Sequence, residues 1–357
     1  MARLKITSEM AEAAVVGGCV LGGGGGGSRA EGLRAAKLAV ETAPLELIDI
    51  EDLPGGATLI NASAVGAPSA KTALATPQDF SDAVKQLCHF TGQEAAGIFT
   101  NEMGGLATVN GWMQSALLGI PVVDAPSNGR AHPTGVMGAL GLHAVPGYES
   151  VQAAIGGDPA CRRRIELVVR GTIDQTSAQV RHAATLAGGL VAVARNPVTV
   201  DYARKHGANG AVKQAIRLGQ AMLACREQGG EAVIQAVCGE LKAQVLHRGP
   251  VERMELICQG GFDVGTVTWP GFGLTFWNEY MTAEADGRRL GTFPDLIMTL
   301  DAQTGWPVTS AEVQEGMDIV VICAPKSSLL LGAGMRDPEL FKQCEEAVGK
   351  SIISYSF

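Results

Sequence analysis

The segment Ala14–Ala30 reads AVVGGCVLGGGGGGSRA and joins an apolar run, six glycines and the start of a helical pattern. The apolar residues Ala14–Leu21 predict a buried strand, and Gly32–Ala43 predicts a helix. Glycine permits positive φ and lets backbone N–H groups approach a ligand, and a helix N-terminus adds a positive dipole end. The segment therefore predicts an α/β fold with a loop that binds an anion or an electron-rich heteroatom.

The glycine run does not by itself identify the ligand. Any six glycines contain the letters of the dinucleotide fingerprint, and no acidic residue in a clear second-strand context supports that function. No Gly-Lys-Ser or Gly-Lys-Thr follows, which disfavours a phosphate-binding P-loop. The structural alternative is a tight turn between closely packed elements. A turn needs only one or two glycines, however, and each further glycine costs about 0.5–1 kcal/mol of backbone entropy.

Short apolar runs alternate with helical patterns over roughly the first 160 residues. This alternation predicts an α/β layer built on a mostly parallel sheet, whose strands are buried on both faces. After the glycine run, the predicted strands are Leu45–Ile50, Thr58–Ala64, Ala96–Thr100 and Ile120–Asp124, and the predicted helices are Pro77–Thr91 and Gly111–Leu118.

Three predicted strands end in glycine-rich or polar segments. Leu21 leads into the glycine run, Thr100 into Asn101–Gly105, and Val123 into residues 124–133. Ligand sites in such sheets lie beyond the carboxyl ends of the strands. We therefore expect these three segments to surround one binding hollow.

The C-terminal part has a different pattern. Residues from about 165 to 235 predict a strand, Ile165–Val169, and then helices separated by a turn at Arg195-Asn196-Pro197. Closely spaced alternating segments with glycine turns then predict an antiparallel barrel or sandwich. The predicted domains are 1–237, α/β, and 238–334, mainly β, with the tail 335–357 returning to the first. The strands predicted for the β domain are Met254–Gly260, Gly265–Trp269, Gly273–Asn278, Tyr280–Ala285, Leu296–Asp301 and Asp318–Ala324, and Asp337–Gly349 is predicted to be helical.

The composition limits partners and location. The 357 residues are 46% hydrophobic and 18% charged, as in a compact globular protein, and the net charge of −8 disfavours nucleic acid or an anionic membrane as a partner. The eight cysteines form no C-x-x-C pair, and the N-terminus has no apolar leader. These features predict a cytoplasmic protein without a membrane span. Base rates favour a symmetric homo-oligomer.

A set of short segments, in the expected order along nearly the whole chain, resembles the S-methyl-thiohydantoin desulfurase-like family, which is often found with hydantoinase and oxoprolinase enzymes. The resemblance implies an α/β domain with the glycine-rich segment, a separate mainly β domain, and chemistry on a five-membered cyclic amide or thioamide. The matching segments are Leu21–Gly27, Val65-Gly66-Ala67-Pro68, Asn101–Gly105, Pro121–Pro133, Ala194-Arg195-Asn196-Pro197, Phe276–Gly287, and Phe293–Ile297 with Leu300-Asp301 and Thr304-Gly305.

The chain departs from that family pattern at three places. Ser69-Ala70-Lys71 stands where the family tends to have an acidic residue. Asp124-Ala125-Pro126 replaces Asp-Ala-Asp, and Arg130-Ala131-His132-Pro133 replaces Arg-Ala-Phe-Pro. A missing carboxylate and an added imidazole imply a different substrate or a different reaction.

Hydrolysis of such a ring needs a base for the attacking water and donors for the developing negative charge. Asp124 and Glu102 are the candidate bases, Arg130 and the N–H groups of Gly23–Gly27 are the candidate donors, and His132 is the candidate proton shuttle. The residues predicted to bind substrate are Gly23, Gly24, Gly25, Gly26, Gly27, Ser28, Asn101, Gly104, Gly105, Asn278, Glu279 and Asp295.

Each catalytic candidate also has a structural interpretation. Asp124 is equally compatible with capping a turn, Glu102 with an ion pair to Arg130, and His132 with an ordinary loop position. Asn278, Glu279 and Asp295 are compatible with turn and register roles. No organic cofactor is predicted. A divalent metal is possible through His89, His132 and His143 with Asp124 and Glu102, although neither H-E-x-x-H nor H-x-H occurs.

Three other functions are compatible with the same residues. An isomerase or lyase would use the base to abstract a carbon-bound proton from a similar ring. A non-catalytic accessory subunit of a hydantoinase-type enzyme would bind the ring without converting it. A nucleotide-binding enzyme would use the glycine loop for phosphate.

Overall fold

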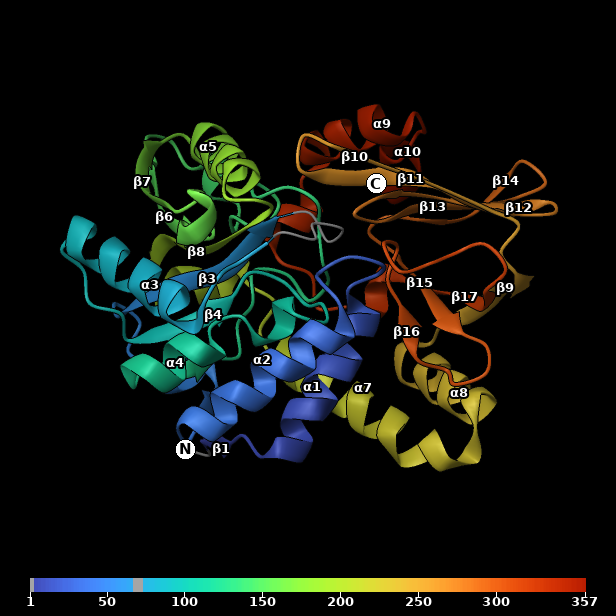
Figure 1. The fold of residues 1–357 in the computed structure, drawn as a ribbon, viewed down its shortest axis with the longest axis horizontal. Helices are drawn as coiled ribbons and strands as arrows, with labels where there is room; N and C mark the ends of the chain where they lie inside the picture. The colour runs from blue at the N-terminus through green and yellow to red at the C-terminus, as the bar shows by residue number, and fades with distance from the viewer. Residues whose placement is uncertain (1–2, 67–72) are drawn as a thin grey trace.

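The described strands of the computed structural model, which covers residues 3–66 and 73–357, form three sheets (Figure 1). An eight-stranded sheet has the order β1-β2-β5-β4-β3-β8-β6-β7. Two smaller antiparallel sheets have the orders β10-β11-β12-β13-β14 and β16-β15-β17-β9. The prediction of an α/β layer with a second, antiparallel β part is therefore confirmed.

The bounds of the strands are β1 Leu4–Lys5, β2 Glu46–Ile48, β3 Thr58–Gly66, β4 Gly97–Thr100, β5 Val122–Val123, β6 Ser150–Gly156, β7 Ile165–Gly171, β8 Leu190–Thr199, β9 Gln244–Pro250, β10 Arg253–Gln259, β11 Phe262–Trp269, β12 Phe272–Trp277, β13 Glu279–Ala285, β14 Arg288–Thr292, β15 Leu296–Asp301, β16 Pro307–Val308 and β17 Asp318–Ala324. The helices are α1 Ser8–Leu21, α2 Arg29–Thr42, α3 Pro77–Thr91, α4 Trp112–Leu118, α5 Ile173–Leu186, α6 Val200–His206, α7 Ala211–Cys225, α8 Gly230–Leu241, α9 Lys342–Val348 and α10 Ile353–Ser356.

The large sheet is mixed. Pairing is parallel along β2-β5-β4-β3, the strands predicted from the alternating pattern. The remaining strands β1, β8, β6 and β7 join antiparallel. The carboxyl ends of β3 and β4 therefore point toward the same edge of the sheet, where the candidate site lies.

The prediction of a strand over Ala14–Leu21 is wrong, because these residues form the second half of helix α1. The helix begins at an N-cap, Thr7, whose side chain accepts a hydrogen bond from the backbone of Met10. It is buried against α7 at very short range: a Cβ atom on Gly17 would lie 2.0 Å from the carbonyl oxygen of Ala215. A uniformly apolar run has no period that separates a buried helix from a buried strand.

The predicted turn at Arg195-Asn196-Pro197 is also wrong, because all three residues belong to β8. The pairing of β8 with β3 has an irregularity at this point, and Asn196 has a φ of +47°. A bulge of this kind accommodates turn-favouring residues within a sheet. It brings Arg195 to the buried part of the strand.

The two antiparallel sheets enclose a shared core, to which Val267 and Phe276 contribute from one sheet and Ile297 and Val321 from the other. Alternate residues of the four-stranded sheet, such as Met298, point to the opposite face and join the core of α1, α7 and α8. The four-stranded sheet is therefore buried on both faces and connects the two parts of the molecule.

The C-terminal tail is helical, as predicted, and packs on the five-stranded sheet near β11 and β12 (Figure 1). Phe341 and Cys344 of the tail share a core with Trp277 and Met281. The same cluster contains Met137, and Asp337 pairs with His143 at 2.8 Å. The described part of the tail thus packs on the β part, and it also contacts the α/β part through Asp337 and through Leu340, which packs against a core cluster of that part.

The described helices include none with both the length and the apolar character required to cross a lipid bilayer.

Candidate functional site

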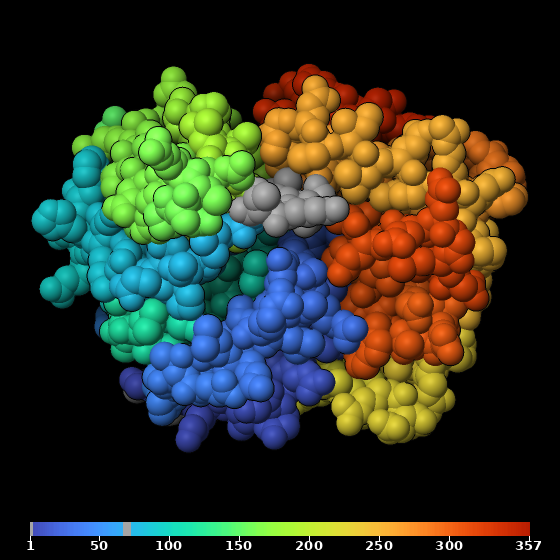
Figure 2. Space-filling model, viewed as in Figure 1, coloured from blue at the N-terminus to red at the C-terminus, as the bar shows by residue number. Residues whose placement is uncertain are grey.

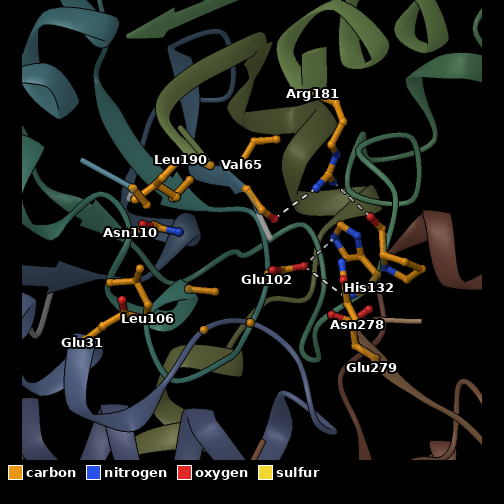
Figure 3. A pocket seen from close by; sticks show the side chains of 18 residues that line it. Glu31, Val65, Glu102, Leu106, Asn110, His132, Arg181, Leu190, Asn278 and Glu279 are labelled. Carbon is orange, nitrogen blue, oxygen red and sulfur yellow. Dashed lines mark hydrogen bonds and ion pairs between the residues drawn. The ribbon is translucent and has the colours of Figure 1, made fainter. Parts of the chain in front are cut away.

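A pocket with a cavity volume of about 120 Å³ lies where the predicted segments meet (Figure 3). The carboxyl end of β3 and the loop after β4 line it, together with the glycine loop, the segment after β5, helix α5 and the β12–β13 junction. In Figure 3, Glu102, His132, Asn278 and Glu279 gather at one side, and Leu106, Asn110 and Leu190 lie at the other. The pocket therefore has a polar side and a more apolar side.

The glycine loop connects helix α1 to helix α2, rather than a strand to a helix. Its first half packs tightly on the β part: a Cβ atom on Gly25 would lie 1.9 Å from Glu279 Oε1, and the carbonyl of Gly23 accepts a hydrogen bond from the backbone of Tyr280. Its second half packs on the loop after β4, where a Cβ atom on Gly26 would lie 2.6 Å from the Cα of Gly104. Close packing thus requires glycine at several of these positions.

Gly26 and Gly27 also line the pocket, with φ values of +75° and +83°. Within the described part of the chain, neither backbone N–H donates a hydrogen bond. They lie next to Ser28, the N-cap of α2, whose hydroxyl accepts a hydrogen bond from the backbone of Glu31 at 3.2 Å. Two free amides at the positive end of a helix can stabilise a developing negative charge. A Cβ atom on Gly105 would lie 2.6 Å from the carbonyl oxygen of Gly27, so Gly105 packs directly against the glycine loop.

Glu102 and His132 contact each other inside the pocket. Glu102 Oε2 accepts a hydrogen bond from the backbone N–H of His132 at 3.1 Å and lies 3.3 Å from His132 Nε2. His132 Nδ1 faces the carbonyl oxygen of Thr134 at 2.9 Å, so Nδ1 carries the proton and Nε2 faces the carboxyl group. The Asn101 amide lies 3.1 Å from the same Nε2 and holds the ring from the other side.

Burial controls the protonation of this pair. Desolvation raises the pKa of Glu102 to about 7, against the opposing effect of its hydrogen bond from His132 and of nearby arginines. Desolvation, with the charge of Arg195, lowers the pKa of His132 to about 3. Near neutral pH the imidazole is therefore neutral, and the Glu102 carboxyl gains and loses its proton, as a general acid or base must.

A second buried carboxyl group, Glu279, lines the pocket next to Asn278. Its Oε2 is buried and has no hydrogen-bond partner among residues 3–66 and 73–357. Desolvation, and then the nearby charge of Glu102, raises its pKa well above the usual range. Asn278, with a φ of +57°, holds the junction by accepting a hydrogen bond from the backbone of Asp263. The site thus combines two carboxyl groups that repel each other when both are ionised.

Sequence reasoning missed two arginines near these carboxyl groups. Arg181 of α5 lines the pocket, where its guanidinium donates to the carbonyls of Gly66, Gly261 and Pro133 and lies over the Phe262 ring. Arg195 of β8 is buried, and its guanidinium lies 3.2 Å from the Asn101 amide. Burial lowers the pKa of both arginines to about 10, so both remain charged at neutral pH. No motif marks Arg181 on helix α5, whereas Arg195 lies in the family-like segment Ala194-Arg195-Asn196-Pro197, for which the sequence predicts a turn and not a part of the site.

Arg130 lies beneath the glycine loop and is not among the residues that line the pocket. Its guanidinium donates to the carbonyls of Pro294 and Asp295 and stacks over the Phe293 ring. A Cβ atom on Gly23 would lie 2.7 Å from Arg130 Nη2. Arg130, predicted as a donor to the substrate, therefore packs against the glycine loop instead. Its positive charge lowers the pKa of Glu102 and Glu279, against the effect of their burial.

Asp124 does not line the pocket. Its carboxylate accepts hydrogen bonds from the backbone N–H groups of Val212 and Lys213, at 2.8 and 3.2 Å, in the first turn of α7. Burial raises its pKa to about 6, against those two hydrogen bonds. The structure thus gives Asp124 the capping interaction. Asp295 likewise lies outside the pocket lining, where its side chain accepts a hydrogen bond from the backbone of Lys326.

We expect Asp124→Ala to destabilise the protein by about 1–3 kcal/mol, because two buried N–H groups lose their acceptor. The activity of the folded variant should stay within twofold of the wild type. Urea denaturation and initial rates at low temperature separate the two effects. A large loss of activity at unchanged stability would instead restore Asp124 as a catalytic residue.

The metal ligands proposed from the sequence are dispersed. His143 pairs with Asp337, Asp124 caps α7, and His89 lies on α3, whereas His132 and Glu102 share the pocket. The described residues contain no group of three histidine, cysteine or acidic side chains arranged to hold a metal ion. The segment Ser69-Ala70-Lys71, where the chain departs from the family pattern, lies outside the described residues, as do Ala67 and Pro68.

Comparisons with known proteins agree with this architecture. A search of curated proteins found no match. A crystal structure of a protein from Chromobacterium violaceum is similar, with a TM-score of 0.69, 20% sequence identity and 96% of each chain covered, which shows a shared fold. The sequence models of the S-Me-THD-like N-terminal domain and C-terminal domain match residues 9–158 and 172–335. Because these two matches cover nearly the whole chain, the protein belongs to the S-Me-THD-like family.

Proposed function

We propose that this protein hydrolyses a C–N or C–S bond of a small five-membered cyclic amide, imide or thiohydantoin. One observation carries the proposal: two buried carboxyl groups with raised pKa values, Glu102 and Glu279, face a pocket that also contains the free amides of Gly26 and Gly27. Carboxyl groups tuned in this way are typical of acid–base catalysis. The family name supports the choice of ring.

Glu102 is the proposed base. Its carboxylate takes a proton from the attacking water, and the contacts with His132 hold the carboxylate in place during this step. The new C–O bond converts the ring carbon into a tetrahedral centre and places negative charge on a ring oxygen or nitrogen. The Gly26 and Gly27 amides and the charge of Arg181 stabilise that atom.

Glu279 is the proposed acid. Because burial raises its pKa well above the usual range, Glu279 holds a proton more readily than an ordinary carboxyl group, and this protonated form can give the proton to the departing nitrogen or sulfur. Water first attacks the ring carbon as Glu102 takes its proton. The ring bond then breaks, and Glu279 gives its proton to the leaving group. Transfer of the proton from Glu102 to Glu279, through solvent or His132, restores both carboxyl groups and completes the cycle.

Isomerisation of a similar ring is the second candidate, because the same pair of carboxyl groups suits abstraction of a carbon-bound proton and its return to a neighbouring atom.

The test is to incubate the purified chain with a panel of hydantoins, thiohydantoins and cyclic imides and to measure the molecular masses of the products. Hydrolysis adds the elements of water, and isomerisation leaves the mass unchanged. An inert chain that gains activity only with a hydantoinase-type partner would show an accessory subunit. Parallel assays with EDTA test the predicted possibility of a divalent metal.

We expect kcat/KM to rise with pH through about 7, because Glu102 must be ionised to act as a base and burial places its pKa near that value. The rate should fall again where Glu279 loses its proton, at a pH above the usual carboxyl range because burial raises its pKa. Initial rates between pH 5 and about 10 measure both limbs. A flat profile, or a rate that rises only toward low pH, would contradict these roles.

A further inference from the structure

A second recess, with a cavity volume of about 250 Å³, adjoins the candidate active site. The two cavities share the lining residues Glu31, Leu106, Asn110 and Leu190. In Figure 3 these four residues stand on the side of the pocket opposite Glu102 and His132. A molecule held against the glutamates can therefore extend past Leu106 and Leu190 into the recess.

The recess is lined mainly by apolar side chains. Leu38 of α2, Pro77 and Phe80 of α3, Val109 just before α4, and Met113 of α4 contribute to it. Figure 2 shows a hollow on this face between the blue surface of α2 and the cyan surface that includes α3. Leu38 is 45% exposed rather than packed into the core. Exposed apolar surface next to a polar site is typical of a ligand-binding groove.

A buried polar group at the recess also lacks a partner. Gln114 lines the recess and is 1% exposed, and its Oε1 accepts a hydrogen bond from the backbone of Gly111 at 3.0 Å. Its Nε2 has no acceptor in the described regions of the chain. Buried donors are normally satisfied, so this amide is a polar exception in the mainly apolar lining of the recess.

We propose that the recess binds the apolar substituent of the substrate ring, so that the substrate is a five-membered ring bearing a large side chain of the kind found in leucine or phenylalanine. This inference rests on the proposed function of the adjoining pocket. The ring lies between Glu102 and the glycine amides, and the substituent passes Leu106 and ends near Phe80 and Met113. Substituents that fill the recess should bind about fourfold more tightly for each buried methylene group.

The test compares kcat/KM for an unsubstituted ring and for the same ring with a methyl, isobutyl or benzyl group. Wild-type protein should prefer the isobutyl or benzyl ring by more than about tenfold. Ala35→Phe places an aromatic ring in the recess from helix α2 and should lower that preference at least tenfold. Thr42→Phe is the matched control, because Thr42 is exposed at the far end of the same helix and should leave the preference unchanged.

A second variant protects the test against misfolding of the first. Leu38→Gln changes an exposed lining residue and should reduce the preference severalfold without affecting stability. Binding of the same rings, measured by calorimetry, separates this inference from the proposed reaction. Preferential binding without turnover supports the recess and refutes hydrolysis. Turnover without preference, or a preference that Ala35→Phe leaves intact, overturns the recess, and absence of both binding and turnover overturns both proposals.

Discussion

Glu102→Gln is expected to lower kcat on the true cyclic substrate by about 10²- to 10⁴-fold, the usual contribution of a positioned general base. Glutamine keeps the shape of the side chain and can still accept the hydrogen bond from the backbone of His132. It cannot take a proton from water. Because the substitution also removes a buried carboxyl group with a raised pKa, the variant should be at least as stable as the wild type at neutral pH.

The sign of that stability effect follows from linkage. The folded protein holds the Glu102 proton more tightly than the unfolded chain, in which the carboxyl group has its ordinary pKa of 4.5. This contribution to stability is present below the unfolded pKa and is lost as the pH rises through about 7. The advantage of Glu102→Gln should therefore be visible by thermal unfolding above pH 7 and absent at acidic pH.

The matched control is Glu31→Gln, because Glu31 lines the same pocket from the exposed first turn of α2. We expect its kcat to stay within about threefold of the wild type, since it is not placed to activate water. Single-turnover rates on the ring panel measure both variants. Equal losses in the two variants would mean that general negative charge, and not a base at Glu102, supports the reaction.

Gly26→Ala should cost roughly 2–5 kcal/mol of folding stability, from the sum of a left-handed conformation and overpacking. Gly26 has a φ of +75°, and its Cβ would lie 2.6 Å from the Cα of Gly104, which is backbone and cannot move aside. The loop would have to shift, and the amides of Gly26 and Gly27 would shift with it. Activity should therefore fall together with stability, as urea denaturation and kcat/KM measurements would show.

Gly92→Ala isolates the conformational part of this cost. Gly92 ends helix α3 with a φ of +67°, similar to that of Gly26, but a Cβ atom there would meet nothing within 4 Å. Its substitution should cost about 1–2 kcal/mol and leave kcat unchanged. If Gly26→Ala lowered the folding stability no more than Gly92→Ala, a Cβ atom would fit between Gly26 and Gly104. The steric explanation for the glycine run would then be wrong.

The two interpretations of the glycine run apply to different positions. Gly23 and Gly25 are small because Arg130 and Glu279 lie directly against them, which is the packing alternative. Gly26 and Gly27 line the pocket, and their backbone N–H groups donate no hydrogen bond within the described residues, so these two positions are the ones that the proposed binding role requires. Composition alone cannot distinguish these positions, because both needs select the same residue.

The convergence of sequence segments on one hollow was partly predictable. Glu102 and His132 follow strand ends or adjoining loops, and strand ends in an α/β sheet point to a common edge, so both reach the pocket. Asp124 follows β5 in the same way, yet its carboxylate caps α7, a helix almost ninety residues later in the chain. Nothing near Asp124 in the sequence signals that partner.

By itself the sequence determined the α/β class, the positions of β3, β4 and α3, and the antiparallel character of the C-terminal part. These features depend on hydrophobic period and turn residues, which are local. The tertiary structure alone decided that Ala14–Leu21 is helical, because its close packing on α7 selects a helix from a run without a period. It also decided the charges in the pocket. Burial sets the pKa of Glu102 and Glu279, and Arg181 approaches them from helix α5. Both effects arise from contacts between residues far apart in the chain, which no local pattern in the sequence can indicate.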